Sequence, residues 1–396
     1  MNSKLFLKLL LHIVVLNFFL IYLYNTIITF FAFIKKNNNI LNIKDSTKFL
    51  ILIPCHNEED VIYNTIKHIY LSNYDKQNFT IVPILDNCTD NTFNEVNRFI
   101  TDYESTNCMP IPVKGGTKPK ALNAATKNLK STNQWGNYDS IVVIDADNVI
   151  DKNMLRIYNS LHFKGEKILQ CRILSHNDNT TVAKGFTSSF NHITYGFQIS
   201  RNNVGLSASL CGTGFSINRH VWDAVGFENC SSLAEDLEFS ILSIINGYKV
   251  KFVKESYVLN QNLDEFKPSV TQRLRWCRGH VQVMVKCLPK IIVSFIRKPR
   301  FQLIDSLLFL STPSRTLLYI LVNLLAVTYK SSIIPLWVFV TLALYNLFFI
   351  LYCNKFKVRY MIPHFCYAVS MQIILILGLF TYNKRNWVKT VHKKIS

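Results

Sequence analysis

Residues 141–148 read IVVIDADN. Four β-branched apolar residues lead directly to Asp145 and Asp147, which are separated by one small residue. The apolar run predicts a buried strand, and two carboxylates at its end repel each other and are costly to desolvate. A divalent cation removes that cost, because Mg²⁺ or Mn²⁺ binds carboxylate oxygens together with diphosphate oxygens. We therefore predict a metal site here, the alternative being helix caps or solvated loop acids.

The chain around this strand alternates short apolar runs with longer mixed segments. This pattern predicts an α/β domain with a mostly parallel sheet and helices on both faces. In such sheets ligands bind beyond the carboxyl ends of the strands, where the polar motifs of this chain fall. The expected strands are 49–53, 80–85, 140–144 and 167–172, and the expected helices are 58–71, 91–103, 119–130 and 151–162.

Two further motifs follow expected strands or open expected helices. Asp86 comes after the apolar run IVPIL, and Asp90 or Asn91 is better placed to cap the next helix, which leaves Asp86 free for a base or ribose. The stretch GGTKPKALNAA places Lys118 and Lys120 at a glycine-rich turn that opens a helix, which suits a phosphate. An ordinary basic helix start is the alternative reading of the two lysines.

Small and acidic residues mark a second group of candidates. Residues 210–218, LCGTGFSIN, predict either a tight turn in the core or a backbone wall close to a ligand. Glu235 and Asp236 lie near a helix start, where the helix dipole favours negative charge. A carboxylate there that faces a sugar hydroxyl would instead serve as a general base.

The stretch QRLRWCRGH at 272–280 gathers arginines and a tryptophan ahead of a hydrophobic region. Arg binds phosphate oxygens bidentately. Trp offers a flat face for a sugar and also favours the membrane interface. A basic interfacial helix accounts equally well for the stretch, and both readings are compatible.

Composition narrows the classes of partner. The 396 residues carry a net charge of +19, which suits a membrane surface or a phosphate-bearing small molecule. No compact basic-aromatic module is recognisable, so we expect no nucleic acid partner. The ten cysteines include no C-x-x-C pair, which argues against a zinc ribbon and favours reduced thiols in the cytosol.

Both ends of the chain are hydrophobic enough for membrane segments. Residues 5–34 are long enough for an uncleaved anchor, and Lys35 and Lys36 place the following residues in the cytosol. Three more spans are expected at 303–327, 333–353 and 361–382. By the same charge rule the basic tail after these spans should lie on the cytosolic side of the membrane, whereas three spans would place it on the opposite side. One of the three is therefore re-entrant or interfacial, or the rule fails at the tail.

The motifs ILDN, KPKALN, DAD, CGTG, ED and QRLRW, in this order and flanked by membrane segments, resemble the membrane-embedded family 2 glycosyltransferases. That family includes cellulose, chitin, hyaluronan and poly-N-acetylglucosamine synthases. The resemblance implies a Rossmann-like nucleotide-diphospho-sugar transferase domain of the GT-A type with transmembrane helices at both ends. It also implies an inverting transfer from a UDP-sugar that depends on Mg²⁺ or Mn²⁺.

The resemblance assigns a role to each motif. Asp236 would be the catalytic base, and Asp147 the more direct metal ligand beside Asp145. The residues expected at the nucleotide sugar are Asp86, Lys120, Asp145, Gln272, Arg275 and Trp276. The residues expected at the acceptor are Cys211, Gly212, Thr213, Gly214, Glu235 and Trp276.

The same resemblance implies a division of the chain. The expected segments are an anchor at 1–36, a cytosolic glycosyltransferase domain at 48–265, interfacial helices at 266–300, transmembrane helices at 301–382 and a basic tail at 383–396. We expect a multi-pass plasma membrane protein that moves N-acetylglucosamine or glucose to a growing glycan. A lipid-linked acceptor taking a single sugar is the alternative. The spans are few, so an accessory membrane subunit or a homo-oligomer is expected to complete any channel.

Overall fold

The computed structural model describes residues 3–104, 106–314, 317–318 and 336–384, and these form two compact units. One unit, here called the sheet unit, contains Lys36–Asn177 and Leu206–Asn262. The other, here called the helical unit, contains the residues before the sheet unit, Asp178–Gly205, and the described residues from Leu263 onward. The catalytic domain predicted at 48–265 therefore contains an insertion, 178–205, that belongs to the helical unit.

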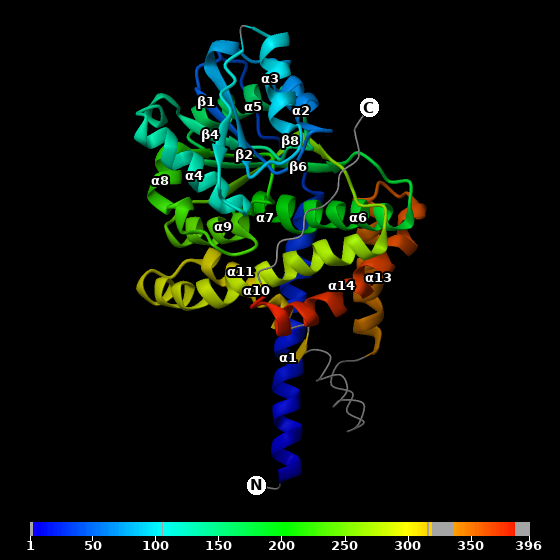
Figure 1. The fold of residues 1–396 in the computed structure, drawn as a ribbon. Helices are drawn as coiled ribbons and strands as arrows, with labels where there is room; N and C mark the ends of the chain where they lie inside the picture. Colours follow the sequence, from blue (N-terminus) through cyan, green and yellow to red (C-terminus); the bar gives the residue numbers. More distant parts are fainter. Residues whose placement is uncertain (1–2, 105, 315–316, 319–335, 385–396) are drawn as a thin grey trace. The chain divides into compact units, whose positions relative to one another are not determined.

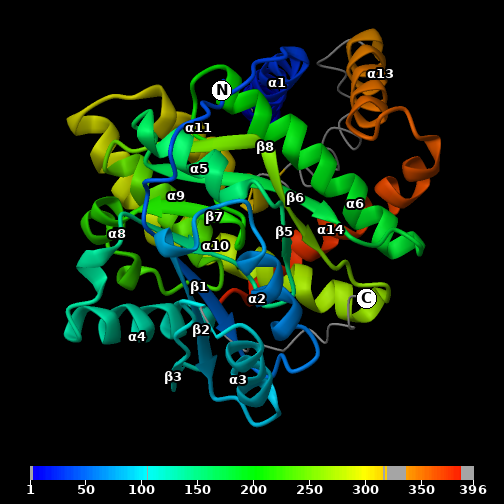
Figure 2. The ribbon, with the colours of Figure 1, turned by 90° about the horizontal axis from the view of Figure 1, so that it is seen from above.

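The first half of the sheet is parallel, as predicted. Strand β1 (Phe49–Cys55) pairs with β2 (Phe79–Asp86) on one side and β4 (Ser140–Val143) on the other, with Phe49 opposite both Phe79 and Ser140. Strand β3 (Ile111–Val113) pairs with β2 at the edge of the sheet, so that β2 lies between β1 and β3, as Figure 2 shows. Because parallel strands are covered on both faces, they read as unbroken apolar runs.

The second half of the sheet is mixed, which corrects the prediction of a mostly parallel sheet. The full order is β3-β2-β1-β4-β7-β6-β8-β5. Strand β7 (Phe215–Asn218) runs antiparallel to both β4 and β6 (Ile168–Ser175). Strand β8 (Val250–Asn260) is parallel to β6 and antiparallel to β5 (Val149–Ile150). The glycine-rich loop before β7 returns the chain against β4, which alternation of strands and helices alone does not predict.

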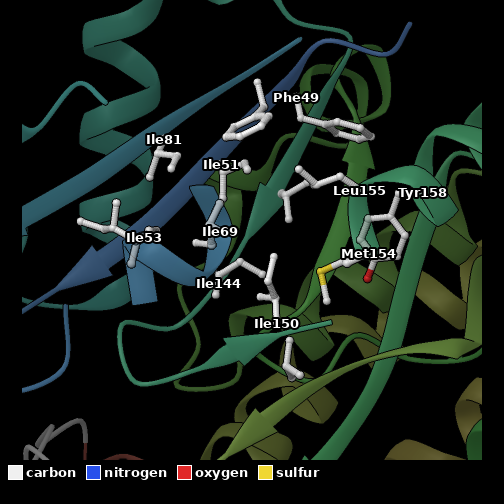
Figure 3. Close-up of a cluster of buried hydrophobic side chains, with 14 of the residues drawn as sticks. Phe49, Ile51, Ile53, Ile69, Ile81, Ile144, Ile150, Met154, Leu155 and Tyr158 are labelled. Carbon is white, nitrogen blue, oxygen red and sulfur yellow. The ribbon is translucent and has the colours of Figure 1, made fainter. Parts of the chain in front are cut away.

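Helices pack on this sheet around one hydrophobic core. Figure 3 shows side chains of β1, β2 and the helix at 154–163 meeting in it, among them Ile51, Ile81, Leu155 and Tyr158, all fully or almost fully buried. The helices of the sheet unit are α2 (Ile62–Tyr70), α3 (Thr92–Asp102), α4 (Lys118–Ser131), α5 (Met154–Phe163), α8 (Arg219–Val225) and α9 (Glu235–Ile245). The first four occupy the predicted ranges to within four residues at either end.

The helical unit is built from long apolar helices and one inserted segment. Its helices are α1 (Ser3–Phe30), α6 (Thr181–Ile193), α7 (Ser200–Asn203), α10 (Phe266–Arg297), α11 (Phe301–Leu310), α13 (Leu336–Cys353) and α14 (Met361–Thr381). Within this unit, Figure 1 shows α1 running crosswise to α6, α10 and α14. A π-helical turn, Thr194–Ile199, joins α6 to α7, and short 3-10 turns lie at Phe31–Phe33 and Val358–Tyr360.

A buried ion pair ties three of these helices together. The guanidinium of Arg201 in α7 donates to the carboxylate of Asp305 in α11 at 2.9 Å, and Tyr24 of α1 donates to the same carboxylate at 2.9 Å. Both charged side chains are less than a tenth exposed. Breaking one partner would leave an uncompensated buried charge, so the pair fixes α1 against α7 and α11.

The predicted membrane segments are helical where they are described. Among the described residues, three helices are long and apolar enough to cross a membrane: His12–Phe33, Phe266–Arg297 and Val358–Thr381. The predicted span 333–353 is represented by α13, and the predicted span 303–327 begins with α11, while its residues 319–327 lie outside the described residues. The basic tail lies outside them from residue 385 onward. The segment predicted as interfacial helices at 266–300 is mostly one continuous helix, α10.

Candidate active site

The ammonium group of Lys118 connects the polar motifs of the sheet unit. Lys118 is the first residue of α4, directly after the glycine-rich turn. Its Nζ forms an ion pair with Asp145 and donates a hydrogen bond to the carbonyl of Gly212 at 2.7 Å. Three segments that are distant in sequence therefore meet at one lysine: the start of α4, the end of β4 and the loop before β7.

The two carboxylates at the start of α9 belong to the same cluster. Burial alone would lower the pKa of Lys118, but the negative charges of Asp145, Glu235 and Asp236 raise it above its ordinary value. Gly212 lies against Asp236, because a Cβ at this glycine would be 3.7 Å from Asp236 Oδ2. The structure thus places the predicted metal-binding acid, the predicted base and the predicted acceptor wall in one cluster.

Burial raises the pKa of Asp236 above its ordinary value, and the nearby charge of Asp145 adds to this shift. The backbone N–H of Leu237, which donates to Asp236 Oδ1 at 2.8 Å, and the charge of Lys118 both oppose it. A carboxylate with a raised pKa is a stronger proton acceptor once it is ionised. Asp236 is therefore suited to removing a proton from a hydroxyl group near neutral pH.

A chain of buried hydrogen bonds orients the Asp145–Asp147 pair. Thr213 Oγ1 accepts from the backbone N–H of Asp145 at 3.0 Å and donates to Asn148 Oδ1 at 2.6 Å. The Asn148 amide donates to Asp147 Oδ1 at 3.1 Å and to Asn260 Oδ1 at 3.1 Å. Since Asn148 is fully buried, its amide fixes Asp147 relative to the loop that carries Thr213.

Replacing Asn148 is expected to weaken metal binding. Asn148→Ala removes the donor to Asp147 and leaves Thr213 and Asn260 without their partner, which should cost about 1–3 kcal/mol of stability. We expect a lower affinity for Mn²⁺ in a direct binding titration, together with a lower melting temperature. Asn260→Ala is the matched control, since it removes one partner of Asn148 but keeps the bond to Asp147. Equal Mn²⁺ affinities in the two variants would contradict an orienting role for Asn148.

The loop Cys211–Gly214 is held in place by a buried glutamine of β6. Gln170 Oε1 accepts from the N–H of Cys211 at 2.9 Å, and its Nε2 donates to the carbonyl of Thr213 at 3.0 Å. Gly214 has a φ of +64°, and a Cβ there would lie 2.5 Å from Cys171 Sγ. Glycine is therefore required at 214 by both conformation and space. The loop is a tight turn in the core, which confirms the first reading of LCGTGFSIN. It also faces Lys118 and Asp236, and the second reading, a wall close to a ligand, stays a prediction.

Asp86 has a partner that the sequence did not reveal. It ends β2, and its buried carboxylate accepts hydrogen bonds from the backbone N–H groups of Gly115 at 2.6 Å and Gly116 at 2.8 Å. The expectation that Asp86 is left free for a ligand is therefore corrected: it fixes the glycine-rich turn that leads to Lys118. Asp90 supports the start of α3 as expected, accepting from the N–H of Thr92 at 3.0 Å. A contact from Asp86 to a base or ribose stays a prediction.

The remaining predicted residues are one lysine of the sheet unit and three residues of the helical unit. Lys120 is exposed on the first turn of α4, and it is Lys118 that meets the carboxylates. Gln272, Arg275 and Trp276 belong to α10 of the helical unit, and there the ring of Trp276 packs edge-on against Phe186 at 6.1 Å between ring centroids. Their predicted roles toward the nucleotide sugar and acceptor stay predictions.

Sequence reasoning missed two residues that build the cluster, Asn148 and Gln170. Asn148 follows the D-x-D pair directly, which is the one local signal that could have singled it out. Gln170 stands in an apolar strand as its one amide, and a buried amide with no apparent partner in the sequence is a signal for a hydrogen-bonding role.

The carboxylates of Asp145 and Asp147 suit a metal ion that also binds oxygens of a bound diphosphate. Among the described residues, no group of three or more His, Cys, Asp or Glu side chains could hold an ion alone. Asp145 is partly exposed, with its side chain 37% accessible, and lies two residues before Asp147. Two carboxylates completed by diphosphate oxygens form the kind of site that Mg²⁺ or Mn²⁺ occupies in enzymes that bind nucleotides. The residues present therefore fit such an ion.

The Rossmann-like mixed sheet with its acidic cluster at the strand ends defines a GT-A-type glycosyltransferase. The family model Glycosyl transferase family group 2 matches residues 140–352, which is more than half of the chain, and Glycosyl transferase family 2 matches residues 50–226. The chain belongs to the family 2 glycosyltransferases, as its motifs predicted.

Curated relatives agree with this assignment. The chain is 30% identical over 258 residues to the probable glycosyltransferase YdaM of Bacillus subtilis (strain 168). It is 22% identical over 251 residues to a poly-beta-1,6-N-acetyl-D-glucosamine synthase of Staphylococcus aureus (strain MSSA476). Each match covers 62% of this chain and 58% of the relative, so the chain spans less than two thirds of the length of these relatives.

A solved structure shares the fold. The mannosyltransferase PcManGT from Pyrobaculum calidifontis, in complex with GDP-Man and Mn²⁺, superposes with a TM-score of 0.63 and 14% sequence identity. The superposition covers 94% of this chain and all of that one. The predicted fold class is thereby confirmed.

Proposed function

We propose that this chain is an inverting, membrane-bound glycosyltransferase that moves N-acetylglucosamine or glucose from a UDP-sugar to a growing polysaccharide. The observation that carries the proposal is the cluster around Lys118, which brings Asp145, Gly212 and Asp236 together at the carboxyl end of the sheet. The named poly-beta-1,6-N-acetyl-D-glucosamine synthase among the relatives supports the choice of product class and donor.

The residues of the cluster divide the chemistry between them. Asp236 would take the proton of the acceptor hydroxyl while that oxygen attacks the anomeric carbon from the face opposite the leaving group. The bond from the anomeric carbon to the phosphate oxygen breaks, and the nucleoside diphosphate leaves with the bonding electrons. Lys118 holds Asp145 in place, and its positive charge lowers the repulsion between the carboxylates and the diphosphate.

A divalent ion would complete the diphosphate site. Mg²⁺ or Mn²⁺ held by Asp147 and Asp145 would supply positive charge to the departing diphosphate. Arg275 of α10 is proposed as a second positive charge on the departing diphosphate, because an arginine side chain binds phosphate oxygens bidentately.

The decisive experiment measures nucleotide release. Purified full-length protein in detergent, incubated with Mn²⁺ and a panel of UDP-sugars, is expected to release UDP from one or two donors. Product size separates the acceptor classes: a ladder of glycans supports polymer synthesis, and a single glycolipid supports one transfer to a lipid. Release from none of the UDP-sugars, but from GDP-mannose instead, would overturn the proposed donor.

Metal removal gives a separate expected result. Treatment with EDTA should abolish UDP release, and added Mn²⁺ or Mg²⁺ should restore it, because two carboxylates without a cation repel a diphosphate. Turnover that is unchanged in excess EDTA would contradict a metal site at Asp145 and Asp147.

A further inference from the structure

Helix α14 has two different faces along its whole length. One face packs on α6 and α10, while the other carries a stripe of large apolar side chains that recur every three or four residues and are 47–75% exposed. The stripe consists of Ile362, Phe365, Val369, Ile373, Leu377 and Phe380. At 21 residues the helix is about 30 Å long, so length alone allows it to cross a bilayer.

The first packing partner of α14 cannot itself cross a membrane. Segment 178–205, which contains α6, continues into the sheet unit at both ends. It is too short to cross twice, since each crossing needs about 20 apolar residues. Helix α14 lies directly on it: a Cβ at Gly185 of α6 would be 3.0 Å from the carbonyl oxygen of Pro363 and 3.2 Å from the Cβ of Tyr367. Segment 178–205 therefore holds α14 on the side of the membrane that carries the sheet unit.

The second partner brings charge alongside α14. Arg273 of α10, almost fully buried, donates to Ser370 Oγ at 2.7 Å, and Arg278 donates to Thr381 Oγ1 at 3.0 Å. Gly378 allows close approach, since a Cβ there would be 2.8 Å from the Cβ of Cys277. A crossing α14 would carry Arg273, which lies beside the middle of the helix, into hydrocarbon, at a cost of several kcal/mol. Figures 1 and 2 show α6, α10 and α14 of the helical unit lying along one another.

Positive charge flanks α14 at both ends. Lys355, Lys357 and Arg359 precede the helix, and Lys384 follows it. Basic residues beside a hydrophobic helix favour the cytosolic side and the anionic lipid headgroups there. Positive charge at both ends fits a helix that stays on one side, whereas a crossing helix would normally carry it at one end.

We propose that α14 lies in the membrane interface with its apolar stripe in the lipid, and does not cross. The proposal rests on the membrane attachment that is part of the proposed function. It replaces the predicted third C-terminal span, 361–382, and it removes the conflict between that span and a basic tail on the cytosolic side. Residues 357 and 384 then face the same side as the sheet unit.

Topology is tested by labelling cysteines in sealed vesicles of both orientations with a membrane-impermeant maleimide, with the labelled positions identified by peptide mass spectrometry. Lys357→Cys and Lys384→Cys should both react in the orientation in which Glu228→Cys, at an exposed position of the sheet unit, reacts. Ser3→Cys, at the start of α1, marks the opposite side. Labelling of positions 357 and 384 from opposite sides would overturn the proposal.

The occupant of the stripe is tested by depth-dependent quenching. A fluorophore on Val369→Cys should be quenched by nitroxides near the headgroup more than by nitroxides deep in the acyl chains, and vesicles with anionic lipid should increase the effect. Ser370→Cys, on the packed face, is the matched control and should be quenched less. If no lipid nitroxide quenches the fluorophore at position 369, a second copy or another protein covers the stripe. That result would overturn the proposal that the stripe lies in lipid. Neither assay measures sugar transfer, so failure here is distinguishable from failure of the proposed function.

Discussion

Asp236→Asn is expected to reduce kcat for sugar transfer by about 10²–10⁴-fold, the usual contribution of a positioned general base. The amide keeps the size of the side chain and can still accept the hydrogen bond from the N–H of Leu237. It cannot take a proton from the acceptor hydroxyl. Nucleotide affinity should be nearly unchanged or slightly higher, because one negative charge near the diphosphate is removed. UDP release and UDP binding, measured on the same preparation, separate the two effects.

Glu228→Gln is the matched control for this variant. It makes the same chemical change on an exposed side chain of the sheet unit, outside the cluster around Lys118. Its turnover should equal that of the parent protein. Unimpaired turnover in Asp236→Asn would remove Asp236 as the base, and Glu235, which also contributes to the charge around Lys118, would become the next carboxylate to test.

The parallel half of the fold could be predicted because its signals are local. Buried parallel strands appear as apolar runs, and IVVI at 141–144 or FLILI at 49–53 is enough to place them. The antiparallel return of β7 depends instead on how the loop Cys211–Gly214 is held by Gln170 and packed on Cys171. These contacts lie more than forty residues apart, and no periodicity encodes them.

The same distinction between local signals and long-range contacts explains which residues of the candidate site could be predicted. Asp145, Asp147 and Asp236 could be selected as candidates because each stands at the end of a strand or the start of a helix. The choice of Lys120 over Lys118 rested on family spacing, whereas the contact depends on which side of the first turn of α4 faces the strand ends. Hydropathy predicts that α14 spans the membrane, because it measures apolar content and not which face is packed. Its placement in the interface is the proposal made above.

Lys118→Met should shift the acidic limb of the pH dependence of kcat/KM to higher pH. Asp236 acts as a base only when ionised, so activity falls as the pH drops through its pKa. Burial and Asp145 already raise that pKa, and the charge of Lys118 counteracts them. Removing that charge therefore raises the pKa of Asp236 further, because a nearby positive charge favours the ionised carboxylate. The measurement is a pH series of kcat/KM on parent and variant, with the Tm of each recorded as a check on folding.

Lys120→Met supplies the contrast that makes the result specific. It removes the same charge two residues away, on an exposed side chain, where solvent and salt screen its effect on Asp236. Its acidic limb should coincide with that of the parent. A shift in both variants would point to a general change in the field of the basic surface. A shift in Lys118→Met alone ties the protonation of Asp236 to the lysine that links Asp145 to Gly212, whether through its own charge or through its hold on Asp145.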